Sequence, residues 1–213
     1  MLDKSESVHR PSVFYLFIKR LFDIVASFIA IIIFIPIFIC ISISIKVESK
    51  GPVLFKHKRI GYKGKVIYLY KFRSMVNNAE DLIKTFTPEQ QKEWKESYKL
   101  KDDPRITRVG SFLRKTSLDE LPQLLNILNG DLSVVGPRPV IGDELEKYGL
   151  NKEKFLSVKP GLTGYWACHG RSNTTYNERM KMELFYVDNM SFCMDMKIIL
   201  ETVVSVLKKE GAV

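Results

Sequence analysis

The sequence predicts a mainly helical α+β protein, in which an N-terminal membrane helix precedes a short β-hairpin and amphipathic or surface helices around a small cytoplasmic domain. Three observations predict this fold: an uncharged run of 22 residues, two β-rich segments around a glycine turn, and leucines at helical spacing. The 213 residues are 46% hydrophobic and 27% charged, which excludes an intrinsically disordered chain.

The uncharged run extends from Ile24 to Ile45, between Asp23 and Lys46. A helix of this length measures about 33 Å at roughly 1.5 Å per residue, close to the hydrocarbon thickness of a bilayer. Signal peptides have apolar regions of only about 7–15 residues, and a core helix is seldom apolar on every face. The run therefore predicts a membrane-inserted helix. Pro36 removes a backbone hydrogen bond, so we expect a kink there.

The excess positive charge of the chain directly follows the apolar run. Residues 46–75 carry nine lysines and arginines against Glu48 alone, whereas residues 76–213 carry equal numbers of both signs. Such a cluster is attracted to anionic lipid headgroups at about 1 kcal/mol per residue. A nucleic-acid-binding protein would need a basic face on its folded domain. Membrane lipids are therefore the expected partners, and nucleic acid is not.

Positive charge lies on both sides of the apolar run, with Lys19 and Arg20 before it and Lys46 after it. The positive-inside rule favours the cytoplasm for the richer C-terminal flank, and the N-terminal pair has the same preference. Two arrangements remain open: a single kinked span, or a kinked helical hairpin that enters and leaves the same leaflet. In both, residues 1–50 form the membrane segment and residues 51–213 the cytoplasmic domain.

The first elements beyond the membrane segment are a β-hairpin and a surface helix. Val53–Ile60 and Lys65–Phe72 are rich in β-branched and aromatic residues and flank the turn Gly61–Gly64, which predicts a hairpin. Asn77–Leu100 is polar, with apolar residues spaced for a surface helix that is interrupted at Thr87.

The later helices are predicted from apolar spacing. Four leucines between Leu121 and Leu128 recur at i, i+3, i+4 and i+7, and Gly130 follows as a helix stop. Tyr176–Val187 and Met194–Lys209 are further helices. The stretches rich in proline and glycine are expected to be loops, namely Gly136–Pro139 and Lys159–Gly170.

An adjacent acidic pair, Asp119 and Glu120, is the most promising site for chemistry. Ser117 and Glu120 match a capping box, so an ordinary helix start explains the pair equally well. Two adjacent carboxylates can, however, divide the roles of nucleophile or metal ligand and of base. Arg114 lies just upstream, as an anionic substrate would require. Arg138, between two prolines, offers a guanidinium on a stiff loop for bidentate phosphate binding.

Three cysteines, Cys40, Cys168 and Cys193, are too few and too scattered to predict a disulfide framework or a zinc site. Cys168 and its neighbour His169 suggest a Cys–His nucleophile pair. Because adjacent side chains seldom face one another usefully, we expect a packing role for Cys168 instead. Trp166 is likewise expected to pack rather than to stack on a nucleoside.

A set of motifs in a fixed order resembles the bacterial sugar transferases of the monotopic phosphoglycosyl transferase family. The resemblance covers the chain from about Lys19 to the C-terminus, including the apolar run. The matching stretches are Lys71–Met75, Asp103–Thr107, Ser117–Gln123, Asn126–Ser133, Val135–Pro139 and Lys159–Gly164.

This resemblance implies an enzyme. It would transfer a sugar 1-phosphate from a nucleotide diphosphate sugar, expected to be a UDP-sugar, to undecaprenyl or another polyprenyl phosphate, and release the nucleoside monophosphate. That reaction would initiate the assembly of an exopolysaccharide, a capsule or a similar surface glycan. The resemblance implies Asp119 as the nucleophile of a covalent phosphosugar intermediate. Glu120 would assist metal binding or activation of the lipid phosphate. Mg²⁺, held by Asp119 and Glu120, is the implied cofactor.

Five further residues are candidates for binding the substrate. Arg114 and Arg138 lie in matching motif positions and would contact phosphate. Lys71, Arg73 and Arg171 are candidates as well, although each fits a surface or salt-bridge role equally.

The resemblance also implies a re-entrant membrane hairpin broken near Pro36, with both ends on the cytoplasmic side of the bacterial inner membrane. The sequence departs from the family at Cys168 and His169, where small or amide residues are usual, and this leaves the identity of the sugar open. Two other functions compete with the transferase. One is a non-enzymatic membrane adaptor with a basic anchor, and the other is a metal-dependent phosphohydrolase.

Overall fold

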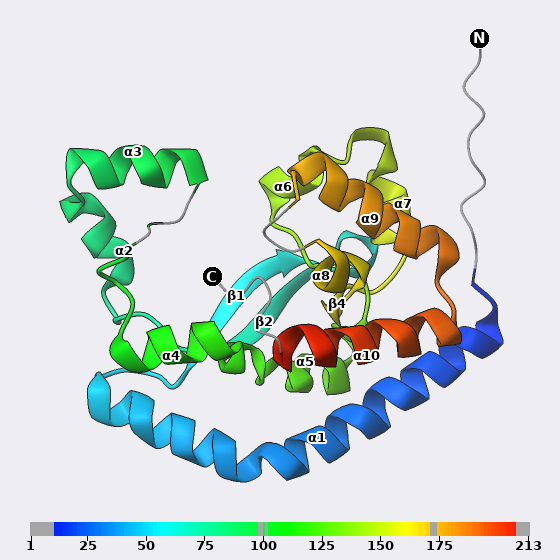
Figure 1. Cartoon of the computed structure of the whole chain (residues 1–213), viewed down its shortest axis with the longest axis horizontal. Coiled ribbons are helices and arrows are strands. Elements are labelled where there is room, and N and C mark those ends of the chain that lie inside the picture. Colours follow the sequence, from blue (N-terminus) through cyan, green and yellow to red (C-terminus); the bar gives the residue numbers. More distant parts are fainter. Residues whose placement is uncertain (1–10, 98–99, 101, 171–173, 208–213) are drawn as a thin grey trace.

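The computed structural model describes residues 11–97, 100, 102–170 and 174–207. It is a mainly helical α+β structure with one β-hairpin and one small parallel sheet (Figure 1). The helices are α1 (Val13–Glu48), α2 (Ala79–Leu82), α3 (Pro88–Ser97), α4 (Arg108–Thr116), α5 (Gln123–Asn129), α6 (Gly142–Glu146), α7 (Lys152–Leu156), α8 (Tyr165–His169), α9 (Tyr176–Asn189) and α10 (Phe192–Leu207). The strands are β1 (Leu54–Ile60), β2 (Val66–Phe72), β3 (Ser133–Val135) and β4 (Gly161–Thr163).

The predicted apolar helix is part of the longer helix α1, which extends beyond both ends of the predicted segment. The side chain of Ser12 caps its first turn by accepting a hydrogen bond from the backbone N–H of Tyr15, at 3.1 Å. The helix is continuous through Pro36, and Figure 1 shows it as an arc bent in its middle. Its most apolar part has a mean hydropathy of 3.2 and is only 11% buried. By length and composition α1 can therefore associate with a membrane.

The predicted β-hairpin is confirmed. Strands β1 and β2 pair antiparallel from Leu54 with Phe72 to Ile60 with Val66. Along the first part of β2 the burial alternates, so that Ile67 and Leu69 enter one hydrophobic cluster, whereas Phe72 at the end of the strand is buried in a second cluster. This alternation places one face of the hairpin on α5 and α1.

The predicted helices are also confirmed, with shifted ends. The described part of the segment 77–100 contains α2 and α3, separated before Pro88 as expected. Helix α5 ends at Gly130, whose φ of +81° lies in the left-handed region that favours glycine at a helix end. Helices α9 and α10 correspond to the two predicted C-terminal helices.

The prediction of an irregular loop over residues 159–170 is wrong, because this stretch contains β4 and α8. Strand β4 pairs parallel with β3, Ser133 with Gly161 and Val135 with Thr163. The backbones approach so closely that a Cβ on Gly161 would lie 2.1 Å from the backbone nitrogen of Gly136. Strands β3 and β4 have three residues each and pair although they lie far apart in the chain. Strands this short leave no periodic pattern in the sequence.

The inner face of α1 closes two of the hydrophobic clusters beneath the hairpin. In one, Ile67 and Leu69 of β2 meet Leu124 and Ile127 of α5, with Ile31 of α1 against them. In the other, the buried residues are Ile41 and Ile45 of α1, Phe72 of β2 and Leu113 of α4. The end of β2 and the start of α5 are thus held close to α1. The division into residues 1–50 and 51–213 stays a prediction.

Candidate active site

The acidic pair lies on a tight turn between two helices. Helix α4 ends at Ser117, and a short 3₁₀ turn from Leu118 to Glu120 follows. Ser117 adopts a φ of +57°, a left-handed conformation that is uncommon for residues other than glycine. Its backbone N–H donates to the carbonyl of Arg114 at 3.2 Å. The predicted capping box is therefore wrong: Ser117 terminates α4, and within the described residues its side chain makes no helix-capping bond.

Lys71 connects the two carboxylates of this pair. It comes from β2, and its Nζ lies 2.6 Å from Oε1 of Glu120 and 4.0 Å from Oδ2 of Asp119. Asp119 itself is 8% exposed. The fold therefore brings together three of the predicted site residues from two separate parts of the chain.

The two carboxyl groups have different environments, and their pKa values move in opposite directions. Burial raises the pKa of Asp119 and the charge of Glu120 adds to this, although Lys71 opposes the shift. Burial acts on Glu120 as well, but Lys71 and Arg138 outweigh it and hold the pKa of Glu120 below its ordinary value. Two adjacent acids whose pKa values are shifted in opposite directions can take different roles in one reaction.

The other predicted cations are distributed differently. The Nε–H of Arg114 donates to the hydroxyl of Ser74 at 2.9 Å, and its charge acts on Asp119. Arg73 is buried, and its guanidinium donates to the backbone carbonyls of Ser49 and Lys50, where the chain leaves α1. The geometry thus brings Arg114 toward the acidic pair and directs Arg73 toward the end of α1. Arg171 lies outside the described residues.

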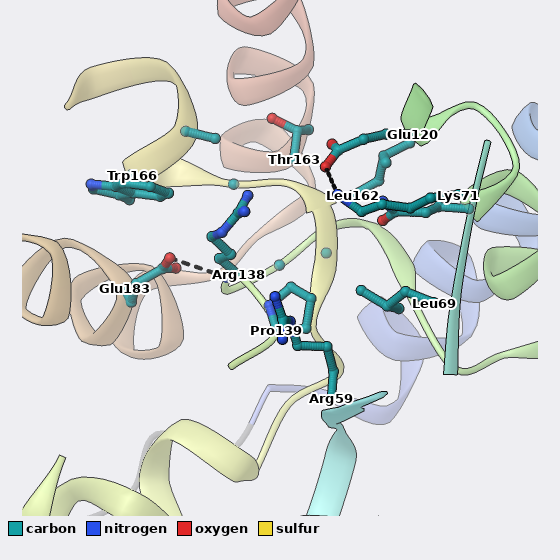
Figure 2. A pocket seen from close by; sticks show the side chains of 15 residues that line it. Arg59, Leu69, Lys71, Glu120, Arg138, Pro139, Leu162, Thr163, Trp166 and Glu183 are labelled. Carbon is teal, nitrogen blue, oxygen red and sulfur yellow. Dashed lines mark hydrogen bonds and ion pairs between the residues drawn. The ribbon is translucent and has the colours of Figure 1, made fainter. Parts of the chain in front are cut away.

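A pocket of about 460 Å³, including its open mouth, is lined by Glu120 of the acidic pair, and Asp119 is not among its lining residues. Lys71 and Glu120 form one wall, and Arg138 and Trp166 lie across from them (Figure 2). The guanidinium of Arg138 lies 5.8 Å from the centroid of the Trp166 ring. Arg59, from the end of β1, lines the pocket as well. Its cationic walls suit an anionic ligand.

Two residues of this pocket, Arg59 and Glu183, are not among the site residues expected from the sequence. Arg59 was counted only within the basic segment 46–75. Glu183 of α9 is 1% exposed and accepts a hydrogen bond from the backbone N–H of Arg138 at 3.0 Å. Trp166 was expected to pack, and it does contact Arg179, yet it also lines the pocket. The one signal for Glu183 in the sequence is that an acidic residue falls on the buried face of a predicted helix.

Glu183 is unusual because its carboxyl is only half satisfied. Its Oε2 is buried and has no hydrogen-bond partner among the described residues. Burial raises its pKa to about 7, against the opposing effects of the Arg138 backbone N–H and the Arg179 charge. The loop that carries Arg138 is therefore held by a carboxyl group whose protonation changes near neutral pH.

Comparison with known proteins decides the family. The family profile described as bacterial sugar transferase matches residues 14–209. The chain belongs to this family.

Several curated relatives of this bacterial sugar transferase carry names that describe a reaction or a process. An undecaprenyl-phosphate galactose phosphotransferase of Salmonella typhimurium is 45% identical over 199 residues, which are 92% of this chain and 42% of that protein. The exopolysaccharide production protein ExoY of Rhizobium meliloti is 42% identical over 197 residues, or 91% of this chain and 87% of ExoY. A UDP-glucose:undecaprenyl-phosphate glucose-1-phosphate transferase of Escherichia coli is 37% identical over 194 residues, which are 87% of this chain and 39% of that protein.

The sugar transferase described here thus spans less than half the length of some relatives and most of the length of ExoY. The resemblance inferred from the motifs is confirmed at the level of the family.

Proposed function

We propose that this sugar transferase moves a sugar 1-phosphate from a UDP-sugar to undecaprenyl phosphate and releases UMP, as the first step in building an exopolysaccharide or capsule. The observation that carries the proposal is the cluster of Lys71, Asp119 and Glu120 beside a pocket with cationic walls. Membership of the family and the names of the relatives support the same reaction.

In this mechanism an oxygen of Asp119 attacks the phosphorus that carries the sugar. The bond from that phosphorus to the bridging oxygen breaks, and UMP leaves with the electron pair. A phosphate oxygen of the lipid then attacks the same phosphorus and displaces the Asp119 carboxylate. Both steps exchange one P–O bond for another, so neither water nor an oxidant is consumed.

Lys71 and the arginines offset the repulsion between the nucleophile and its anionic substrates. Lys71 holds Glu120 at 2.6 Å and lies 4.0 Å from Asp119, so its charge acts on both carboxylates. Arg138 and Arg59 line the same pocket and would bind the diphosphate. Because the pKa of Asp119 is raised by burial, this carboxylate is poorly solvated and correspondingly reactive.

The residues present fit a Mg²⁺ ion. Asp119 and Glu120 offer hard carboxylate oxygens, the ligand type that Mg²⁺ prefers, and Lys71 supplies one positive charge for two negative ones. Asp119 and Glu120 would hold the ion. When bound, it would neutralise charge on the diphosphate as the phosphoryl group moves.

The experiment uses the purified full chain in detergent, with Mg²⁺, undecaprenyl phosphate and a panel of UDP-sugars. UMP release should require the lipid, and intact mass should show a sugar phosphate on the protein when the lipid is omitted. Asp119→Asn should remove both signals, lowering turnover by roughly 10³-fold or more. Asp143→Asn, an exposed acid at the start of α6, is the matched control.

Each competing function gives its own result. Free sugar phosphate in place of the lipid product would indicate a phosphohydrolase. Absence of turnover and of the protein adduct with every sugar tested would favour a membrane adaptor. An Asp119→Asn variant with near-normal rates would exclude the proposed nucleophile.

We also propose that α1 lies in the cytoplasmic membrane as a re-entrant bent helix, with both ends on the cytoplasmic face. Its exposed large side chains from Val13 to Ile43 are apolar, as Phe17 and Ile43 illustrate, with exposed fractions of 65% and 58%. Lys19 near the start and Ile45 near the end both contact the same domain. In a chain whose Cys40, Cys168 and Cys193 are replaced by serine, Ser12→Cys and Val47→Cys should each react with a membrane-impermeant thiol reagent from the cytoplasmic side only. Labelling from opposite sides would indicate a single span.

A further inference from the structure

Three potential metal ligands meet where α8 contacts α10. Cys168 and His169 end α8, and Glu201 projects from α10. Sγ of Cys168 lies 3.6 Å from Oε2 of Glu201, and Nε2 of His169 lies 3.5 Å from the same oxygen. The three ligand atoms all lie within 4.8 Å of one another.

The two separations that involve Oε2 of Glu201 are close to the edges of a tetrahedral zinc site. With Zn–S near 2.3 Å and Zn–N or Zn–O near 2.0–2.1 Å, tetrahedral angles give ligand-to-ligand distances of about 3.3–3.5 Å. A thiolate, an imidazole and one carboxylate form a donor set that favours Zn²⁺ over Mg²⁺. The side chains of His169 and Glu201 are 31% and 34% exposed, so an ion has a path from solvent.

The surroundings orient two of the ligands. Nδ1 of His169 lies 2.9 Å from the backbone carbonyl of Tyr165 and 3.1 Å from Sγ of Cys168, and the rings of Tyr165 and His169 stack with their centroids 4.1 Å apart. A proton on Nδ1 that is donated to this carbonyl leaves the lone pair on Nε2, the nitrogen that faces Glu201. The other oxygen of Glu201, Oε1, lies 3.8 Å from Nζ of Lys197. Oε2 therefore remains available for the ion.

We propose that Cys168, His169 and Glu201 bind a thiophilic divalent metal ion, Zn²⁺, at a site distinct from the acidic pair Asp119 and Glu120. Binding replaces the thiol proton of Cys168 by the metal, and a water completes the coordination. The ion fastens α8 to α10. Because α8 also carries Trp166 and Ala167, which line the pocket, occupancy steadies that wall.

The test uses the 213-residue chain, reduced and in detergent, with Mg²⁺ in excess so that sites with oxygen ligands are saturated. Zn²⁺ is titrated in competition with a chromophoric chelator, and Co²⁺ is used to detect thiolate coordination by its charge-transfer absorption. The wild type should bind about one Zn²⁺ per chain. Cys168→Ser, His169→Gln and Glu201→Gln should each weaken binding by roughly tenfold or more.

Cys193→Ser is the matched control, because Cys193 is an exposed thiol on the same helix as Glu201. It should keep both the affinity and the Co²⁺ absorption. Equal losses in Cys193→Ser and Cys168→Ser would overturn the proposal, as would Zn²⁺ affinity unchanged in Cys168→Ser. Circular dichroism establishes that each variant is folded. Turnover is not the readout, so the outcome does not depend on the proposed transferase reaction.

Discussion

Before Pro36, α1 is held to the domain by charged and polar side chains as well as by apolar ones such as Ile31, whereas between Pro36 and Ile45 its buried contacts are apolar. Nζ of Lys19 lies 2.7 Å from Oδ2 of Asp195, and Arg20 donates to the carbonyl of Ile127 at 2.6 Å. Asp23 accepts hydrogen bonds from Ser133 and from the backbone N–H of Val134.

Beyond Pro36 the contacts change in kind. Ile41 and Ile45 pack with Phe72 and Leu113, and the rings of Phe38 and Phe72 lie 5.3 Å apart. The outer side of α1 is apolar in both halves, so only the inner side differs. A charged side chain facing hydrocarbon would be costly. The first half therefore keeps its charges because the domain supplies a partner for each of them.

The largest expected effect comes from removing one partner of the charged half. Asp195 accepts from Lys19 and from the hydroxyls of Tyr15 and Tyr186, at 2.7–2.8 Å. Asp195→Ala leaves the buried Lys19 ammonium uncompensated and should lower the free energy of unfolding by about 3–5 kcal/mol. Equilibrium unfolding in detergent measures this loss.

Two further variants test whether the loss of stability in Asp195→Ala comes from leaving Lys19 without its ion-pair partner. Replacing both partners, as Lys19→Met with Asp195→Leu, should recover much of the loss, because no charge is then left unpaired. Asp188→Ala removes an acid from the more exposed pair with Lys154 and should cost about 1 kcal/mol or less. If Asp195→Ala lowers the free energy of unfolding no more than Asp188→Ala does, buried ion pairs do not hold the first half of α1 to the domain.

The apolar half should respond to lost volume. Ile45 is 2% exposed, and Ile45→Ala should lower the free energy of unfolding by about 3 kcal/mol through lost burial and a cavity. Ile43→Ala is the matched control on the same helix, because Ile43 is 58% exposed. Similar losses in both variants would mean that α1 does not use its second half for specific packing.

The smallest expected effect concerns Glu183. Its buried Oε2 has no hydrogen-bond partner among the described residues, whereas Asp195 accepts three hydrogen bonds. Because the pKa of Glu183 is raised to about 7 in the folded state, folding binds a proton near neutral pH. The associated stability is present at low pH and is lost as the pH rises through 7. We expect the free energy of unfolding to fall by about 2 kcal/mol between roughly pH 5.5 and pH 8.

Glu183→Gln should remove this part of the pH dependence while keeping an acceptor for the backbone N–H of Arg138. The same unfolding experiment, repeated across the pH range, measures it. A pH dependence that is unchanged in Glu183→Gln would place the titrating group elsewhere and would remove Glu183 from the comparison.

The local parts of the fold were predictable from the sequence. The apolar run, the hairpin around Gly61–Gly64 and the leucine spacing of α5 each depend on residues close together in the chain, where side-chain period and turn residues determine the backbone. Asp119, Glu120, Arg114 and Arg138 were found in the same way, because their motifs are continuous stretches. The capping box at Ser117 failed because two helices meet there, so the residue ends one instead of starting the next.

The sequence by itself therefore determined the family, the long apolar helix and the acidic pair. Only the tertiary structure decided which distant groups face one another: Lys71 with Glu120, β3 with β4, Glu183 with the Arg138 loop, and Cys168 and His169 with Glu201. It also showed that Lys19 and Arg20, which count as flanking charges in the sequence, are bound inside the fold. Composition and periodicity report local preference, whereas the pairing of charges depends on contacts between residues far apart in the chain.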